Sequence, residues 1–103
     1  MNKYRAKPTV LDGIRFASGR ECARYVELKL LQRAGKITEL ALQPVYRLHA
    51  KGVRIGIYRA DFKYLDVETG KYRVEDSKGF PTALYKWKKR HVEAEHGIEI
   101  EEV

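Results

Sequence analysis

Two aspartates stand where a pair of strands would bring them together. Asp61 lies in a run rich in Ile, Tyr and Phe, residues 54–66, and Asp76 lies in a second such run, residues 71–79. Two runs of this kind joined by a short turn that contains glycine predict a β-hairpin. If paired residues have numbers that sum to 137, Asp61 lies directly opposite Asp76. Lys78 follows and points from the same face of its strand.

An opposed pair of aspartates has a chemical use but no structural one. Like charges directly across a sheet, with Cβ atoms about 5 Å apart, destabilise it. Mg²⁺ supplies a reason for such a pair, because it binds one or two carboxylates and keeps other positions for water and phosphate oxygens. Metal ions on Asp61 and Asp76 could activate a water toward phosphorus and neutralise the leaving oxygen. Lys78 would position or help deprotonate that water, or stabilise the phosphate.

The hairpin interpretation has alternatives. A three-residue turn would move the sum to about 138 and send the two carboxylates to opposite faces, whereas a two- or four-residue turn keeps them together. Asp61, Asp76 and Lys78 could also be ordinary solvent-facing strand residues. The adjacent Glu75 points to the other face by strand alternation.

Glu21 is a third candidate carboxylate. The segment Ser18-Gly-Arg-Glu21 matches a capping box, in which Ser18 and Glu21 satisfy free amides at the start of a helix. A carboxylate in the first turn of a helix that packs against the hairpin could also reach the metals. Both roles stay open. Glu27 faces another side of the same helix and is interpreted as a surface residue.

A cluster of cations follows in a second predicted helix. Lys86, Lys89 and Arg90 share one face by their spacing. Lysine and arginine in such a patch bind DNA phosphates without reading sequence; the alternative is a solvated charged face. The three histidines have no metal-ligand spacing, and we interpret them as structural: His49, His91 and His96.

Length and composition indicate one globular domain over residues 1–103. The chain is 44% hydrophobic and 34% charged, which excludes disorder. Its 21 Lys and Arg against 14 Asp and Glu give a net charge of +7, which suits a polyanionic partner but also simply solubility. The lone Cys22 points to a reducing compartment, and no apolar run is long enough to span a bilayer. We therefore expect a cytoplasmic protein.

The elements that must position these residues follow from turn and cap signals. We expect a small hairpin at residues 9–16, a helix from Ser18 to about Ala34, and one or two strands over residues 37–48 with a break at Gln43-Pro44. After the long hairpin, a second helix runs from Thr82 to about His96, and residues 98–103 form an edge strand. The order predicts an α/β or α+β domain with a mixed sheet flanked by two helices.

Helical periodicity predicts which helix faces are buried. On the first helix, the apolar residues at three- and four-residue intervals are Cys22, Ala23, Val26, Leu30 and Ala34, widened by Leu28 and Leu31. On the second helix, the expected core stripe consists of Leu84, Trp87, His91 and Ala94.

The order of the candidate residues, Glu21, Asp61 and Asp76-Ser77-Lys78, resembles the PD-(D/E)xK nuclease superfamily. Nearly the whole chain is similar to a family of small phage and prophage proteins catalogued as a domain of unknown function and assigned to that superfamily. The similar segments are residues 12–18, 42–44, 60–62 and 74–79, with Glu21, Tyr25 and Leu28.

The resemblance implies a restriction-endonuclease-like core and Mg²⁺- or Mn²⁺-dependent cleavage of phosphodiester bonds. It implies Glu21, Asp61 and Asp76 as metal ligands, with Lys78 catalytic. Ala60 departs from the superfamily pattern, since a proline often stands there. The small size also resembles Holliday-junction resolvases, which act as dimers on branched DNA. The expected function is a metal-dependent DNA endonuclease of this kind; the alternative is a non-catalytic DNA-binding phage accessory module with the same fold.

Overall fold

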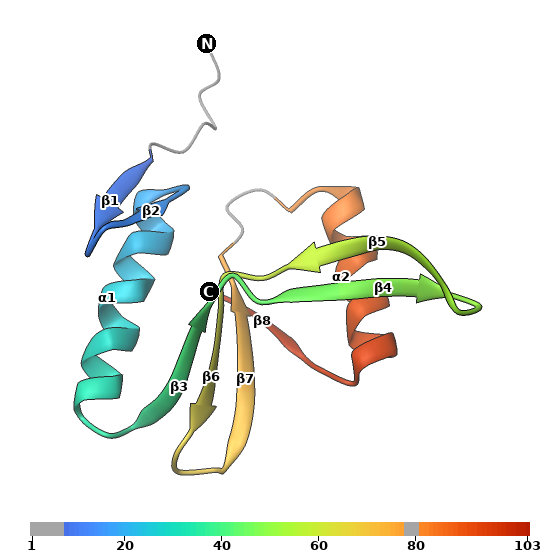
Figure 1. Cartoon of the computed structure of the whole chain (residues 1–103). Helices are drawn as coiled ribbons and strands as arrows, with labels where there is room; N and C mark the ends of the chain where they lie inside the picture. The colour runs from blue at the N-terminus through green and yellow to red at the C-terminus, as the bar shows by residue number, and fades with distance from the viewer. Residues whose placement is uncertain (1–7, 78–80) are drawn as a thin grey trace.

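The structure, a computed structural model, describes residues 8–77 and 81–103 and has two helices and eight strands in that part of the chain (Figure 1). The elements in chain order are β1 (Thr9–Leu11), β2 (Ile14–Phe16), α1 (Gly19–Arg33), β3 (Ile37–Leu42), β4 (Val45–Ala50), β5 (Val53–Arg59), β6 (Phe62–Asp66), β7 (Lys71–Asp76), α2 (Ala83–His96) and β8 (Ile100–Glu102). The predicted α+β class is confirmed. No helix in these residues is long and apolar enough to cross a membrane.

A four-stranded sheet in the order β3-β6-β7-β8 lies at the centre, and β1-β2 and β4-β5 form separate two-stranded hairpins. Within the central sheet, β3, β6 and β7 pair antiparallel, while β8 pairs parallel to β7. The sheet is therefore mixed, and the predicted edge strand after the second helix is confirmed. A restriction-endonuclease-like core remains a prediction from the resemblance.

Two buried clusters divide the interior. The first joins α1, the β1-β2 hairpin and the start of the sheet through Phe16, Cys22, Tyr25, Leu28, Ile37, Phe62 and Tyr64. The second joins α2, the β4-β5 hairpin and the other side of the sheet through Leu48, Tyr58, Ala60, Val74, Tyr85, Val92 and Ile100. The helices thus cover different parts of the strand layer, as Figure 1 shows.

The β6-β7 hairpin has the predicted register. Phe62 pairs with Glu75 and Asp66 pairs with Lys71, so paired residue numbers sum to 137. The turn spans the four residues between Asp66 and Lys71, and Gly70 there takes a φ of 72°, a value that glycine adopts without strain. Asp61 lies one residue before β6, and the pairing of β6 with β7 ends at Phe62 and Glu75, so this pairing does not extend to Asp61 and Asp76.

The first arm of the long hairpin, by contrast, is not one strand. β5 ends at Arg59 and pairs with β4, whereas β6 begins at Phe62 and pairs with β3 and β7. The predicted break at Gln43-Pro44 is confirmed and lies beside this one: the Ala60 N–H donates to the Pro44 carbonyl (3.1 Å) and the Gln43 N–H donates to the Asp61 carbonyl (2.8 Å). The segments β3-β4 and β5-β6 pass from one sheet to the other at the same point. Asp61 therefore lies at a bend and not in the middle of a strand.

Both helices end as predicted, since Ser18 and Thr82 are the N-caps and Gly97 ends α2 in the left-handed conformation. The predicted buried faces are confirmed at Cys22 and Leu28 and wrong at most other positions. In α1 the buried residues are Glu21, Cys22, Tyr25 and Leu28, while Ala23, Val26, Leu30, Leu31 and Ala34 are exposed. In α2 the buried residues are Tyr85 and Val92, while Leu84, Trp87 and Ala94 are exposed and His91 is partly buried. Counting apolar residues omitted Glu21, Tyr25 and Tyr85, whose polar ends find partners inside the fold.

Candidate functional site: a carboxylate cluster at the strand ends

Asp61 lies at the bend between β5 and β6, next to the end of β7. Its backbone N–H donates to the Glu75 carbonyl (3.0 Å), and Glu75 is already the partner of Phe62, so the sum of 137 is not kept at Asp61. Its side chain accepts a hydrogen bond from the Ser77 N–H at 2.6 Å, through Oδ2. The carboxyl of Asp61 is therefore held against the residue that follows Asp76, although Asp61 and Asp76 are not the directly opposed pair that the register predicted.

Asp76 is fully buried at the end of β7. Its Oδ2 accepts a hydrogen bond from the Tyr58 hydroxyl, which comes from β5. Burial and this bond to a carboxylate raise the pKa of Tyr58, so the phenol stays a donor at every ordinary pH. Sequence reasoning missed Tyr58, because it pairs within a different sheet and no local spacing connects it to Asp76.

Glu21 is buried in the first turn of α1, where its backbone N–H donates to the Ser18 Oγ at 3.1 Å. The capping role of Ser18 is thus confirmed. The Glu21 carboxylate also acts on the strand ends, because its charge raises the pKa of Asp61. The cap uses the backbone N–H of Glu21, so the role of its carboxylate as a metal ligand stays a prediction.

The pKa of Asp61 is raised to about 7. Desolvation by burial is the largest cause; the Ser77 N–H opposes it, and the negative charges of Asp76 and Glu21 add to it. Three acidic groups from α1, β7 and the β5-β6 bend therefore interact unfavourably at one place. Perturbed carboxyls of this kind are typical of functional sites.

The cluster fits Mg²⁺ or Mn²⁺ as a two-carboxylate site. In residues 8–77 and 81–103, no group of three or more His, Cys, Asp or Glu side chains is arranged to hold a metal ion. Mg²⁺ does not require such a group, since it is usually bound by one or two carboxylates and otherwise by water and substrate phosphates. Asp61 and Asp76 would supply the hard oxygen ligands, and a cation there would relieve the electrostatic strain on Asp61.

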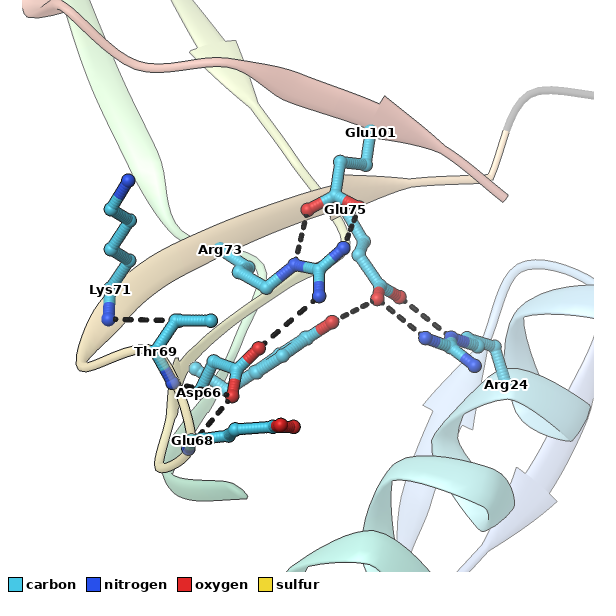
Figure 2. Close-up of polar contacts among 9 residues, drawn as sticks. Arg24, Asp66, Glu68, Thr69, Lys71, Arg73, Glu75 and Glu101 are labelled. Carbon is cyan, nitrogen blue, oxygen red and sulfur yellow. Dashed lines mark hydrogen bonds and ion pairs between the residues drawn. The ribbon is translucent and has the colours of Figure 1, made fainter. Parts of the chain in front are cut away.

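Glu75 is buried on the opposite face of β7, as strand alternation predicted. Figure 2 shows it held by Arg24 of α1, whose guanidinium donates to both carboxylate oxygens at 2.7 and 2.6 Å. The Tyr64 hydroxyl also donates to Glu75. Figure 2 also shows Arg73 joined to Asp66 and Glu101 nearby. These bonds satisfy the carboxylate of Glu75 within the fold, so Glu75 is a structural residue that ties α1 to the sheet.

The predicted cations have different positions. Lys78 lies outside the described residues, so its catalytic role stays a prediction. Lys86 and Arg90 are exposed on α2, whereas Lys89 is tied to Glu102 of β8 at 3.2 Å. The DNA-binding role of Lys86, Lys89 and Arg90 stays a prediction, and Lys89 is the least available of the three.

The fold and the site define an α+β protein in which acidic side chains gather at the end of a mixed sheet. The chain belongs to the family described as "Protein of unknown function (DUF1064)", whose model matches residues 1–100. No curated protein and no solved structure gives a match. Function therefore has to be argued from the chemistry of the site.

Proposed function

We propose that this protein is a metal-dependent DNA endonuclease that hydrolyses phosphodiester bonds at the carboxylate cluster. The observation that carries the proposal is the position of the Asp61 carboxyl, which the Ser77 N–H holds near two buried acids, Asp76 and Glu21. Burial and the charges of these acids raise the pKa of Asp61. A chain gains no stability from gathering three acids in a partly buried place. A bound divalent cation would offset the repulsion among these three acids, which explains why they are gathered there.

Asp61 and Asp76 would hold Mg²⁺ or Mn²⁺, and Glu21 would add negative charge from the start of α1. When bound, the metal ion would supply Lewis-acid chemistry to a phosphodiester. The chain's own bonds keep the ligands in place: the Ser77 N–H orients Asp61, and the Tyr58 hydroxyl orients Asp76. Lys78 would position the attacking water, a role that rests on its place in the sequence.

The order of Glu21, Asp61, Asp76 and Lys78 supports membership of the PD-(D/E)xK nuclease superfamily. Its resemblance to Holliday-junction resolvases makes branched DNA the proposed substrate and a homodimer a form to test. The branched substrate and the homodimer both rest on analogy with the superfamily. The endonuclease chemistry rests on the carboxylate cluster, so activity and substrate preference are tested separately.

A cleavage panel tests the activity. The purified protein is incubated with Mg²⁺ or Mn²⁺ and with four-way junction, flap, linear duplex and single-stranded DNA. We expect cutting of the junction, and loss of cutting in Asp76→Asn, while Asp66→Asn at the far end of β6 serves as the matched control. No cutting of any substrate with either metal, by protein shown to be folded, would refute the proposal.

The second candidate function is a non-catalytic DNA-binding module. The absence of a group of three potential metal ligands in the part of the chain that the structure covers favours it. A binding module would bind the junction with equal affinity with or without metal and leave it intact. An endonuclease would leave cut products whose formation stops when the metal is chelated.

A further inference from the structure

The β4-β5 hairpin carries formal charge of one sign only. Residues 40–60 contain no Asp or Glu, and they carry Arg47, Lys51, Arg54 and Arg59. All four cations are exposed. A stripe of like charge along one element is the electrostatic footprint of a polyanion-binding surface.

The hairpin cations have no carboxylate partner among the described residues. Several other cations are paired: Arg24 with Glu75, Arg73 with Glu101 and Lys89 with Glu102. The side chains of Arg47, Lys51, Arg54 and Arg59 make no ion pair or hydrogen bond with residues 8–77 or 81–103. Within the part of the chain that the structure describes, the fold therefore leaves four cations without an internal partner on this one hairpin.

Local geometry makes this concentration costly. Val45 pairs with Arg59 and Arg47 pairs with Ile57, so Arg47 and Arg59 are diagonal neighbours on the face opposite Tyr58. Diagonal side chains lie about 7–8 Å apart, close enough for like charges to repel. At the hairpin tip, Lys51 has a φ of 50°, where asparagine or glycine would be less strained. The repulsion between Arg47 and Arg59 and the backbone strain at Lys51 both destabilise the hairpin, so the cations have no structural advantage there.

The hairpin is braced as an arm. Figure 1 shows it reaching away from the central sheet and past α2. Three side chains of α2 fasten it: His96 bonds to the Arg47 carbonyl at 2.7 Å, His91 bonds to the His49 carbonyl at 3.0 Å, and Glu95 accepts from the His49 N–H at 2.6 Å. The edge of β4 is thus covered, and the cations stand on a supported strand pair.

The arm starts at the candidate site. Arg59 is the last residue of β5, and Asp61 follows at the bend. A groove of about 220 Å³ lies beside Arg59, and its lining includes Arg59, Ile57, Leu84 and Lys88. Lys88 adds a cation from α2 to this groove. Seven residues of β5 extend about 23 Å at roughly 3.3 Å per residue, over half a turn of B-DNA.

We infer that the β4-β5 hairpin is a duplex-binding arm, which contacts the DNA backbone through Arg47, Lys51, Arg54 and Arg59 and leads the strand toward Asp61. The choice of DNA as the polyanion rests on the proposed function. The arm binds phosphates without reading bases, so its contribution is independent of sequence and falls steeply with salt.

The test measures binding apart from cleavage. Fluorescence anisotropy of a short labelled duplex gives the Kd in EDTA, from about 50 to about 200 mM salt. The variant Arg47→Gln/Arg54→Gln removes two hairpin charges, and Lys29→Gln/Arg33→Gln removes the same charge from the exposed face of α1. We expect the hairpin variant to bind about tenfold more weakly, with a salt slope smaller by about 1.8, and the α1 variant to change Kd less than about twofold.

A charge-preserving variant separates electrostatics from folding. Arg47→Lys/Arg54→Lys should keep the salt slope of the wild type, while circular dichroism confirms that all variants fold. Equal effects of the hairpin and α1 variants, or no duplex binding by the wild type, would overturn the inference. Hairpin-dependent binding to anionic vesicles without binding to DNA would also overturn it. Hairpin-dependent binding with no cutting in Mn²⁺ would sink the endonuclease proposal and leave the arm supported.

Discussion

The charge on Asp61 should cost the fold stability as pH rises, and the variant Asp61→Asn should remove that cost. Asparagine has nearly the same shape, and its side-chain oxygen can still accept the hydrogen bond from the Ser77 N–H. The substitution therefore removes the titration and keeps the contact. Stability as a function of pH isolates the electrostatics of the carboxylate cluster.

The sign follows from the direction of the shift. Burial and the neighbouring acids raise the pKa of Asp61 from 3.8 to about 7, so between these values the folded state binds more protons than the unfolded state. The free energy of unfolding then falls as pH rises through this window. A shift of about 3 units corresponds to at most about 4 kcal/mol at 1.36 kcal/mol per unit. Because Asp61 is only partly buried, solvent screening reduces this to roughly 1–2 kcal/mol.

Urea denaturation at a series of pH values from about 4 to about 8 measures the effect. The wild type should lose roughly 1–2 kcal/mol more than Asp61→Asn across the window. The control Asp66→Asn should keep the wild-type decline. Burial is the largest single influence on the pKa of Asp66 and raises it, but the hydrogen bonds from Thr69, Arg73 and Glu68 and the charge of Arg73 together hold it below its ordinary value, so Asp66 does not titrate in this window. Parallel profiles for the wild type and Asp61→Asn would refute the reasoning.

A divalent cation should offset the same cost. Mn²⁺ that binds the folded state alone raises the free energy of unfolding by mass action. The rise should occur near pH 8, where Asp61 is charged, and should be smaller near pH 5, where a proton on Asp61 competes with the ion. Asp61→Asn should lose most of it. Equal shifts in the wild type and in Asp61→Asn would mean that the ion binds elsewhere.

Further predictions concern the residues around the cluster. Tyr58→Phe removes the donor to buried Asp76 and should lower stability by about 1–3 kcal/mol and weaken Mn²⁺ binding by calorimetry. Glu21→Gln keeps the Ser18 cap and should reduce cleavage at least tenfold with little change in melting temperature. Arg24→Ala strands the buried Glu75 carboxylate and should lower the free energy of unfolding by about 3 kcal/mol in urea.

Matched controls sharpen each result. Tyr72→Phe removes a hydroxyl that bonds to exposed Glu39 and should leave metal binding unchanged. Glu27→Gln, on the exposed side of α1, should retain full cleavage. Full cleavage by Glu21→Gln would leave that residue with its capping contribution alone, and unchanged Mn²⁺ affinity in Tyr58→Phe would show that Asp76 needs no orienting bond.

Local sequence determined the turns, the caps and the register. Ser18, Thr82 and Gly97 mark helix ends because their side chains or conformational freedom satisfy end groups within a few residues. The turn after Asp66 determines the β6-β7 register for the same reason, since its length alone sets which residues pair. These features depend on neighbours along the chain, and the sequence was enough to predict them.

Tertiary contacts decided what the sequence pattern could not. The buried face of α1 runs through Glu21 and Tyr25. The Tyr25 hydroxyl can be buried because it donates to Asp12, and Glu21 is buried beside Asp61, a neighbour that the spacing of residues along the helix does not reveal. Likewise, Tyr58 reaches Asp76 only because the chain bends at Ala60 and joins two sheets. The spacing of residues along the chain determines the register of a hairpin. The partner of a buried polar group depends instead on how elements distant in sequence pack together.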